Sequence, residues 1–381
     1  MRVIGMISGT SFDAIDVAAA DLELADDEVR LRPLGALSVP YPEPLRRRVA
    51  DVLPPSGTTM EEVCRLDTEL GHAFADAAAR GMAELCTGSA DLVVSHGQTV
   101  FHWVEGGTAR GTLQLGQPAW IAERTGLPVV SDLRSRDIAA GGHGAPLVSL
   151  FDVLLLSGRP ATGALNLGGI ANLTVVGDAP LAYDLGPANA LIDAAADHFH
   201  GEPYDAEGRR AAAGTVVPGL LEALLDEPYY ALPAPKSTGK ELYSWDYLAR
   251  RLDPSLSGDD VIATVTELTA VVTARELAVH GLDEVFVSGG GTGNPTLMAR
   301  LAELAEGRVR TIDELGVPSD AKEAYAFALM GFLTAHGLPG TVPSCTGAAG
   351  ARVLGTVAPG ASGLPRAAAV ATAPRRLVVA G

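Results

Sequence analysis

The 381-residue chain contains only three cysteines, Cys64, Cys86 and Cys345, and no Cys-x-x-Cys pair. Such a scattered, odd-numbered set provides neither a disulfide framework nor the ligand spacing of a zinc site, so we expect reduced thiols. Long apolar runs are also missing: none reaches the length of a membrane span, and the N-terminal apolar stretch is too short for a signal peptide. The sequence therefore predicts a cytoplasmic location and no membrane partner.

Basic residues are scarce. Lys and Arg number 28 against 46 Asp and Glu, which gives a net charge of −18 and an isoelectric point near 4.8. Nucleic acids and anionic membranes bind basic surfaces, so this balance argues against both as main partners. The acidity is typical of a soluble protein, and the length allows two domains, each with a sizeable core.

Helical and strand patterns alternate along the chain, which predicts an α/β fold with helices covering the sheets. Residues 59–86 show this best, because their apolar side chains recur with a helical period. A polar loop is expected at 132–144. Strands are expected at 3–7, 91–95, 127–131, 164–167 and 284–288, and helices at 59–86, 117–125, 146–156, 296–306 and 323–336.

A polar turn follows the first strand. Gly9 allows the backbone to approach a ligand closely, and the Thr10 and Ser11 hydroxyls with nearby N–H groups can receive anionic oxygens. Asp13 and Asp16 add carboxylates that suit a hydrated Mg²⁺. The pattern fits a hairpin that holds nucleotide phosphates, and an ordinary structural hairpin with a polar turn would give the same pattern.

Two further glycine turns follow strands, at 168–172 and at 289–293. The first lies between two strands, as the N-terminal turn does, which suggests a duplicated fold with a nucleotide held between the two turns. The second lies between a strand and a helix, where glycines leave room for a flat ring or for phosphates. Each turn is a weak signal alone, and the three in this order are stronger.

Asp184 ends an apolar strand just before a helix that begins near Asn189. A carboxylate in that place can act as a general base. It can also be a simple helix cap, since Asp is favoured at helix starts. Lys236 resembles the lysine of a Walker motif, but the upstream glycine of that motif is missing, so its segment reads as a loop at the edge of the site.

Together these segments resemble the anhydro-N-acetylmuramic acid kinase family, in the superfamily of acetate kinase, hexokinase, heat-shock protein 70 and actin. The resemblance extends over residues 3 to 360, and Ala14 and Ala188 stand where that family usually has Gly. The segments that carry it are 9–16, 95–99, 137–148, 166–173, 233–239 and 343–348.

The resemblance implies an α/β, two-lobed actin-like ATPase fold, of the duplicated ribonuclease H-like kind, with the nucleotide cleft between the lobes. Lobe one is expected at 1–135 and lobe two at 136–381, with a C-terminal segment that can return to lobe one. A hinge near 132–160 would close the lobes on ATP and sugar. A homodimer is also expected. The Ala-rich tail from residue 362 departs from the family pattern and is expected to be disordered or surface-bound.

The reaction implied by the resemblance uses ATP and Mg²⁺ on a 1,6-anhydro sugar during peptidoglycan recycling. Asp184 is the catalytic base, and water opens the anhydro bridge while O6 attacks the γ-phosphate. The sugar contacts are expected to come from Gln98, Thr99, Arg134 and Glu323. The ATP contacts are expected to come from Gly9, Thr10, Ser11, Phe12, Asp13, Ala14, Ile15, Asp16, Gly168, Gly169, Asn172, Gly289, Gly290 and Gly291.

Simpler roles remain open for some of these residues. Arg134 and Arg136 can grip a carboxylate or can be solvated surface arginines. Glu323 opens a helix, so it can merely offset the helix dipole. Two other functions also remain: a kinase for another sugar or a small carboxylic acid, and a non-catalytic nucleotide-dependent switch. A switch needs neither Asp184 nor a sugar-binding arginine, which argues against it.

Overall fold

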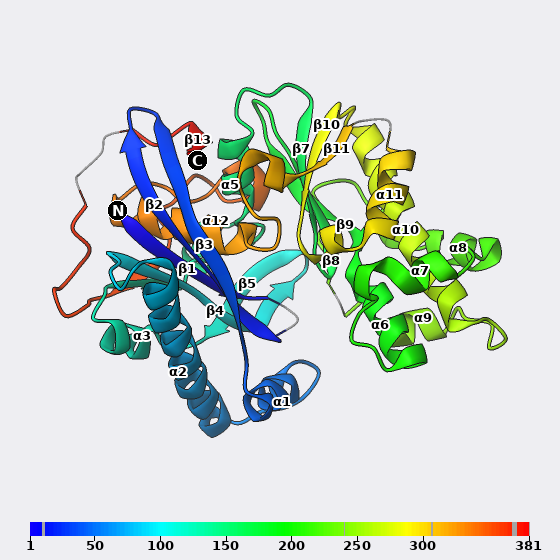
Figure 1. The fold of residues 1–381 in the computed structure, drawn as a ribbon, viewed down its shortest axis with the longest axis horizontal. Coiled ribbons are helices and arrows are strands. Elements are labelled where there is room, and N and C mark those ends of the chain that lie inside the picture. The colour runs from blue at the N-terminus through cyan, green and yellow to red at the C-terminus, as the bar shows by residue number, and fades with distance from the viewer. Residues whose placement is uncertain (10–11, 240, 306–307, 368–371, 381) are drawn as a thin grey trace. The chain divides into compact units, whose positions relative to one another are not determined.

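The computed structural model describes residues 1–9, 12–239, 241–305, 308–367 and 372–380. The chain forms two compact units (Figure 1). Unit 1 comprises Met1–Ser157 and Ala321–Gly381, and unit 2 comprises Gly158–Asp320. The first boundary thus lies beyond the predicted residue 135, and the chain returns to unit 1 for its last sixty residues or so.

Unit 1 is built on an eight-stranded mixed sheet with the order β12-β6-β4-β1-β2-β3-β13, and β5 pairs with β4. Its strands are β1 (Arg2–Ser8), β2 (Ala14–Ala25), β3 (Glu28–Pro40), β4 (Leu92–Glu105), β5 (Thr108–Leu115), β6 (Val129–Ser131), β12 (Thr356–Ala358) and β13 (Arg376–Val379). Its helices are α1 (Glu43–Val52), α2 (Met60–Leu85), α3 (Pro118–Thr125), α4 (Ser135–Ala139), α5 (Ser149–Leu155), α12 (Lys322–Ala335) and α13 (Pro343–Thr346).

Helices pack on both faces of this sheet, and both α2 and α12 contact β1 (Figure 1). Ile4 and Met6 join one core with Leu70 and Phe74 of α2. Gly5 points to the opposite face, where a Cβ would lie 2.1 Å from the Ala324 carbonyl oxygen of α12. Because side chains of a strand alternate between faces, the small residue lets α12 pack directly on the backbone while its neighbours fill the other core.

Residues 136–157 belong to unit 1 because buried polar contacts tie them to its C-terminal part. The Lys322 ammonium lies 2.9 Å from Asp152 Oδ1, and both side chains are buried. Thr346 donates its hydroxyl hydrogen bond to Asp137 Oδ1 at 2.8 Å. Breaking either pair would leave a buried charge or polar group without its partner. Separating the segment from unit 1 would therefore cost free energy.

Unit 2 is built on a five-stranded sheet with the order β11-β10-β7-β8-β9. Its strands are β7 (Thr162–Leu167), β8 (Ile170–Val175), β9 (Leu181–Pro187), β10 (Glu284–Ser288) and β11 (Arg308–Thr311). Its helices are α6 (Asn189–His200), α7 (Arg209–Ala213), α8 (Pro218–Leu225), α9 (Trp245–Ala249), α10 (Gly258–Val279) and α11 (Pro295–Leu304), with short 3₁₀ turns at 206–208, 228–231, 290–293 and 312–315.

The long helix α10 is the centre of unit 2. It is buried over most of its surface and joins one hydrophobic core with β7, β8, β9 and α6. A helix that is apolar all round is expected at the core of a domain or in a membrane. Among the described residues, no helix combines the length and the apolarity that a bilayer span requires.

Most predicted elements match the structure, and three differ. The strand predicted at 91–95 runs on to Glu105, because a glycine turn at Gly106 and Gly107 pairs β4 with β5 as a hairpin. The loop predicted at 132–144 contains α4. The tail was expected to be disordered or surface-bound, but β13 pairs in parallel with β3 and buries Leu377, so disorder is wrong for that strand.

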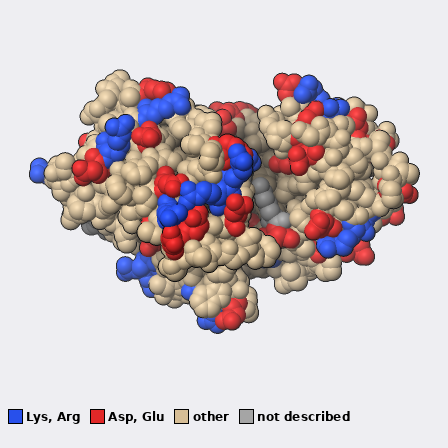
Figure 2. All heavy atoms as spheres, turned by 90° about the horizontal axis from the view of Figure 1, so that it is seen from below, with Lys and Arg blue, Asp and Glu red and all other residues tan. Residues whose placement is uncertain are grey.

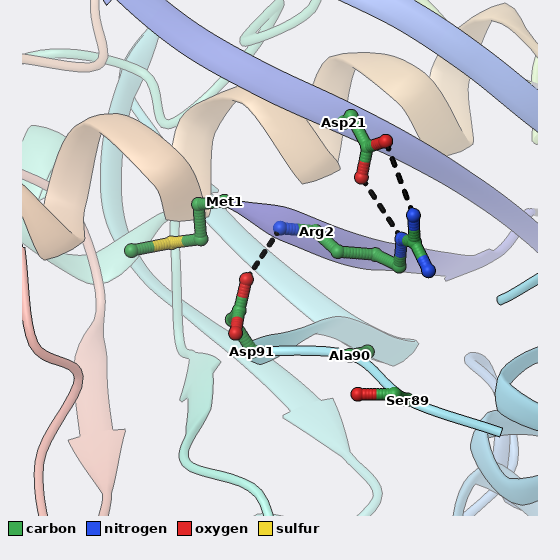
Figure 3. A pocket seen from close by; sticks show the side chains of 6 residues that line it. All are labelled: Met1, Arg2, Asp21, Ser89, Ala90 and Asp91. Carbon is green, nitrogen blue, oxygen red and sulfur yellow. Dashed lines mark hydrogen bonds and ion pairs between the residues drawn. The ribbon is translucent and has the colours of Figure 1, made fainter.

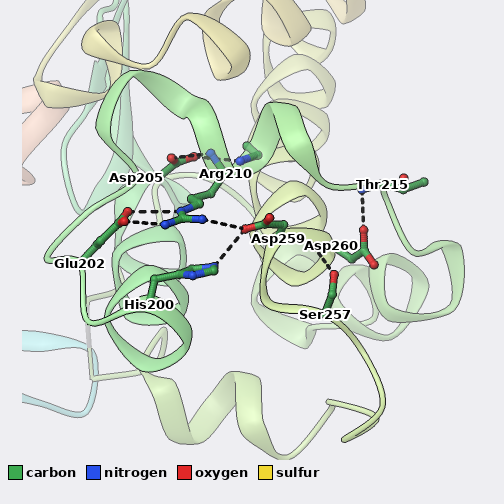
Figure 4. Close-up of polar contacts among 9 residues, drawn as sticks. His200, Glu202, Asp205, Arg210, Thr215, Ser257, Asp259 and Asp260 are labelled. Carbon is green, nitrogen blue, oxygen red and sulfur yellow. Dashed lines mark hydrogen bonds and ion pairs between the residues drawn. The ribbon is translucent and has the colours of Figure 1, made fainter.

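A polar cluster joins α6, α7 and α10 within unit 2 (Figure 4). Asp205 accepts backbone N–H bonds from Arg210 at 2.8 Å and from Ala211 at 3.0 Å, so it caps α7. The Arg210 guanidinium binds Glu202 at 2.6 Å and lies 3.8 Å from Asp259 Oδ1, which is also 3.0 Å from His200 Nε2. The cluster therefore ties the segment after α6 to the start of α10.

We expect Asp205→Ala to lower the free energy of unfolding of unit 2 by about 1–3 kcal/mol, because two buried N–H groups lose their acceptor. Hydrogen–deuterium exchange should be faster at residues 206–214 than in the native protein. The exposed Asp178, replaced by Ala, is the control and should change nothing. Equal exchange in Asp205→Ala and the native protein would contradict the capping role.

Candidate active site

The predicted phosphate turn of unit 1 connects β1 to β2. The Phe12 N–H donates to the Gly9 carbonyl oxygen at 3.2 Å, and Phe12 has a φ of 39°. A positive φ is rare for a bulky residue, so the turn is held in a strained form of the kind found at ligand sites. Asp13 is exposed and accepts the Ala14 N–H at 3.0 Å. Thr10 and Ser11 lie outside the described residues.

Gln98 braces this turn. It is 1% exposed, and its amide oxygen accepts the Ser8 hydroxyl at 2.6 Å. Its amide nitrogen donates to the carbonyl oxygens of Gly9 at 3.3 Å and Thr99 at 3.1 Å. The side chain that we expected to contact sugar therefore holds the last residue of β1 and the first of the turn. Thr99, half-buried beside it, accepts a hydrogen bond from Gln114 at 3.1 Å.

The Arg134 guanidinium is held by a histidine. Its Nε donates to His96 Nε2 at 2.8 Å, and its Nη1 donates to the Gly144 carbonyl oxygen at 2.6 Å. Burial lowers the pKa of Arg134 to about 10, against the opposing effect of Glu323 and Asp137. Burial also lowers the pKa of His96 well below its usual value, and the Arg134 charge adds to this. The imidazole is thus neutral and can accept from Arg134.

The charge of Glu323, another predicted sugar-binding residue, acts on the Arg134 guanidinium and raises its pKa. Glu323 is half-buried in the first turn of α12. The loop after Arg134 is fixed by Asp137, which is fully buried and accepts the Gly144 N–H at 2.8 Å. The helix dipole still acts on Glu323, but its neighbour is a buried cation. Arg136 is exposed.

In unit 2 a row of polar residues crosses four adjacent strands. Ser288 of β10 is in register with Asn166 of β7, Asn166 with Asn172 of β8, and Asn172 with Asp184 of β9. Paired residues in a sheet share a face. A β-bulge between Ala171 and Asn172 interrupts the register with β9 beside this row, as bulges near functional sites often do.

Both carboxylate oxygens of Asp184, its backbone N–H and its carbonyl oxygen all form hydrogen bonds. Its Oδ1 accepts from Asn172 Nδ2 at 2.9 Å, and its Oδ2 accepts from the Ser237 hydroxyl at 2.9 Å and the Thr238 N–H at 3.0 Å. Its backbone N–H donates to the Lys236 carbonyl oxygen at 3.0 Å, and its carbonyl oxygen accepts from the Tyr229 hydroxyl at 2.7 Å.

Burial raises the pKa of Asp184, and the three hydrogen bonds to its carboxylate oppose that rise without cancelling it. The nearby charge of Glu241 raises the pKa further. A raised pKa and a fixed geometry are what a general base near neutral pH requires. The alternative of a helix cap does not fit, because α6 begins after Ala188 with no side-chain cap.

The glycine segments of unit 2 meet at the carboxyl end of β7. A Cβ on Gly289 would lie 2.6 Å from Asn166 Oδ1, and one on Gly291 would lie 2.6 Å from the Leu167 Cβ. These two glycines are thus needed for packing, whereas Gly290 is exposed. The Gly168 and Gly169 carbonyl oxygens accept the first N–H groups of α6. Ala188, where the family usually has Gly, has a φ of −111° and a ψ of −100°, and its methyl group is buried.

The described residues contain no group of three or more His, Cys, Asp or Glu side chains that could hold a metal ion. Mg²⁺ commonly binds one or two carboxylates and completes its shell with water and substrate phosphates. The exposed Asp13 carboxylate, in the turn after β1, is a ligand of the kind that such an ion takes.

The surface of the chain carries other features that lie apart from these residues. On the face shown in Figure 2, acidic and basic side chains are interspersed. A shallow pocket at the start of β1 is lined by Met1, Arg2, Asp21, Ser89, Ala90 and Asp91 (Figure 3). Arg2 already binds Asp21 at 2.9 Å there. The phosphate turn lies at the other end of β1, about 20 Å away.

The family model and the curated relatives that match this chain indicate the same family. The family model described as anhydro-N-acetylmuramic acid kinase matches residues 1–360. The chain belongs to this family. The anhydro-N-acetylmuramic acid kinase of Streptomyces coelicolor is 58% identical over 389 residues, covering 100% of both chains. That of Rhodococcus erythropolis is 58% identical over 392 residues, covering 99% of both.

One of the matching solved structures is much less similar in sequence. A ROK family glucokinase from Streptomyces griseus, in complex with glucose and AMPPNP, is 14% identical, with a TM-score of 0.38 over 86% of this chain and 98% of that chain. A likeness at that level does not bear on the substrate of this member of the anhydro-N-acetylmuramic acid kinase family.

Sequence reasoning missed several residues that position the predicted ones. His96 and Asp137 lie within segments that carry the family resemblance, yet their contacts to Arg134 and its loop come from folding. Ser237, Thr238 and Tyr229 reach Asp184 from more than forty residues away. Asn166 could have been found from the sequence, because an Asn inside an apolar strand is unusual.

We expect acid to destabilise unit 1 through His96. Because folding lowers the pKa of His96, the unfolded chain binds a proton that the folded chain does not, and stability is lost as pH falls below the unfolded pKa of about 6.5. The loss is about 1.4 kcal/mol per pH unit below that point. Thermal unfolding of native and His96→Gln proteins between about pH 5 and 7 measures it.

His96→Gln keeps an acceptor for Arg134 and cannot titrate, so its melting temperature should fall less steeply with acid. The matched control is His72→Gln, which changes an exposed histidine of α2. Parallel pH curves for the native protein and His96→Gln would show that the imidazole is not held neutral.

Proposed function

We propose that this chain is an ATP-dependent kinase that opens the 1,6-anhydro bridge of 1,6-anhydro-N-acetylmuramic acid and phosphorylates O6. The products are N-acetylmuramic acid 6-phosphate and ADP, in peptidoglycan recycling. Family membership over nearly the whole chain supports the substrate. The observation that carries the mechanism is Asp184, a carboxylate with a raised pKa that is held by three hydrogen-bond donors in unit 2.

Asp184 acts as the general base. It takes a proton from water, and the water oxygen forms a bond to the anomeric carbon, C1. The C1–O6 bond breaks, and its electron pair stays on O6, which attacks the γ-phosphorus as ADP leaves. Asn172, Ser237 and Thr238 keep the carboxylate in one orientation, so the base is positioned before substrate arrives.

The sugar is bound by Arg134, Glu323, Thr99 and Gln98. Arg134 is half-buried and oriented by His96, which suits a guanidinium that grips the lactyl carboxylate. Glu323, whose charge acts on Arg134, accepts hydrogen bonds from hydroxyl groups of the sugar. Gln98 contributes through the turn that it braces, since its amide is engaged with Ser8, Gly9 and Thr99.

ATP is bound by the turn at residues 9–16 and by Gly168, Gly169, Asn172 and the glycines at 289–291. Mg²⁺ accompanies ATP and would be held by Asp13 and Asp16 together with phosphate oxygens, where it neutralises charge on the transferred group. Asn172 also holds Asp184, so it would link the nucleotide to the base. We further propose that the protein acts in the cytoplasm, which is consistent with its few, unpaired cysteines. We also propose that it is a homodimer.

The substrate assignment predicts that ADP release requires 1,6-anhydro-N-acetylmuramic acid. With ATP and Mg²⁺ the product should be the 6-phosphate of the opened sugar. In ¹⁸O-water the label should enter at C1 and not the phosphate, because water opens the bridge while O6 takes the phosphoryl group. Turnover of N-acetylglucosamine at an equal rate would overturn the assignment, and ¹⁸O in the phosphate would indicate plain ATP hydrolysis.

Asp184→Asn should lower turnover by about 10² to 10⁴, because the amide keeps the size of the side chain and removes the base. ATP affinity should change far less, since the predicted phosphate turns are untouched. Asn172 can rotate its amide to pair with the new Asn, so the fold should persist. Turnover retained in this variant would move the role of base to Asp13 or Asp16.

A further inference from the structure

Lys236 and Glu276 form a buried ion pair in unit 2 that no step of the proposed reaction uses. Lys236 Nζ lies 2.9 Å from Glu276 Oε1, and the two side chains are 3% and 17% exposed. The ammonium also donates to the Tyr230 carbonyl oxygen at 3.1 Å and lies 5.2 Å from the centre of the Tyr229 ring. Its donors are thus satisfied by the protein.

This placement rules out the role that the sequence around Lys236 first brings to mind. A lysine that grips phosphate must present its ammonium to the ligand, and this one is enclosed by Glu276, Tyr230 and the rings of Tyr229 and Tyr183. Burying a charge is costly unless it is well paired, so a buried lysine of this kind calls for another explanation.

The explanation lies in what the backbone of the same residue does. The Lys236 carbonyl oxygen accepts the Asp184 N–H, and the next two residues, Ser237 and Thr238, donate to the Asp184 carboxylate. Three consecutive residues therefore hold the candidate base. The side chain of the first anchors them to α10 through Glu276.

Glu276 also holds Asp184 from the other side. Its second oxygen, Oε2, accepts the hydroxyl of Tyr183 at 2.9 Å, and Tyr183 immediately precedes Asp184 in β9. The same hydroxyl lies 2.7 Å from His280 Nε2. One carboxylate on α10 thus fixes both the strand that carries Asp184 and the loop that binds it.

We propose that Lys236 and Glu276 are positioning residues for Asp184: their ion pair clamps the 236–238 loop and β9 together, so that the carboxylate meets water in one orientation. This inference rests on the proposed role of Asp184 as the base. The clamp touches no substrate, and it acts through Ser237, Thr238 and Tyr183. Small displacements of a reacting group are enough to cost about 100-fold in rate.

Lys236→Met tests the clamp, because it keeps the length of the side chain and removes the charge. With ATP, Mg²⁺ and 1,6-anhydro-N-acetylmuramic acid, kcat at neutral pH should fall by up to about 100-fold while KM for ATP stays unchanged. Release of the loop removes the hydrogen bonds that lower the pKa of Asp184. The acid limb of the kcat–pH profile should therefore move to higher pH, and the deficit should shrink in alkaline buffer.

Arg300→Met is the matched control. Arg300 of α11 binds Glu267 of α10, the helix that also carries Glu276, through two hydrogen bonds of 2.6 and 2.8 Å. The Glu267 side chain is 9% exposed. This variant also breaks an ion pair made to α10, between a half-buried arginine and a buried glutamate, but the pair does not involve the loop or β9. Its melting temperature should fall, whereas its kcat and pH profile should remain those of the native protein.

The double variant Lys236→Met/Glu276→Gln guards against misfolding of the single one, because it leaves no unpaired buried charge. It should melt above Lys236→Met and still show the shifted pH profile. A native pH profile and kcat in the folded Lys236 variants, with Asp184→Asn inactive, would overturn the clamp and leave the proposed function standing. An equal loss of kcat in Arg300→Met would also overturn the clamp, because it would show that the effect of Lys236→Met is general destabilisation. An active Asp184→Asn would overturn the clamp together with the role of Asp184 as the base.

Discussion

The enclosure of the Asp184 carboxylate is the constraint on which the arrangement of unit 2 depends. A half-buried carboxylate with a raised pKa is unfavourable unless donors surround it, and unit 2 provides them from β8 and from the 236–238 loop. That loop is anchored to α10, because the buried Lys236 of the loop pairs with Glu276 of the helix. The helix at the centre of the hydrophobic core thereby determines the geometry of a single polar side chain at the end of a strand.

Unit 1 applies the same principle to a cation. Arg134 is half-buried, and its guanidinium donates hydrogen bonds to a neutral imidazole and to a carbonyl oxygen. Such partners orient the group without neutralising it. An oriented guanidinium of this kind suits an anionic ligand.

The sequence was sufficient for features that depend on local order and insufficient for those that depend on pairing. The helix at 60–85 follows from its apolar period, and Asp184 was found because a strand end before a helix is visible in the sequence. The row from Ser288 to Asp184 could not be seen, because it requires the register of four strands that are distant in the chain. Lys236 and Glu276 are forty residues apart, and only packing brings a loop against that face of α10.

Four consecutive positions of β4 carry separate duties. His96 orients Arg134, and Gln98 braces the phosphate turn. Thr99 accepts a hydrogen bond from Gln114 of β5. Gly97 bends the backbone at a point where a Cβ would lie 2.6 Å from the Leu115 carbonyl oxygen. Gain or loss of one residue there would shift all four at once, because a strand reverses its faces with each step. A substitution in this stretch therefore changes one contact, whereas an insertion or a deletion would change all of them.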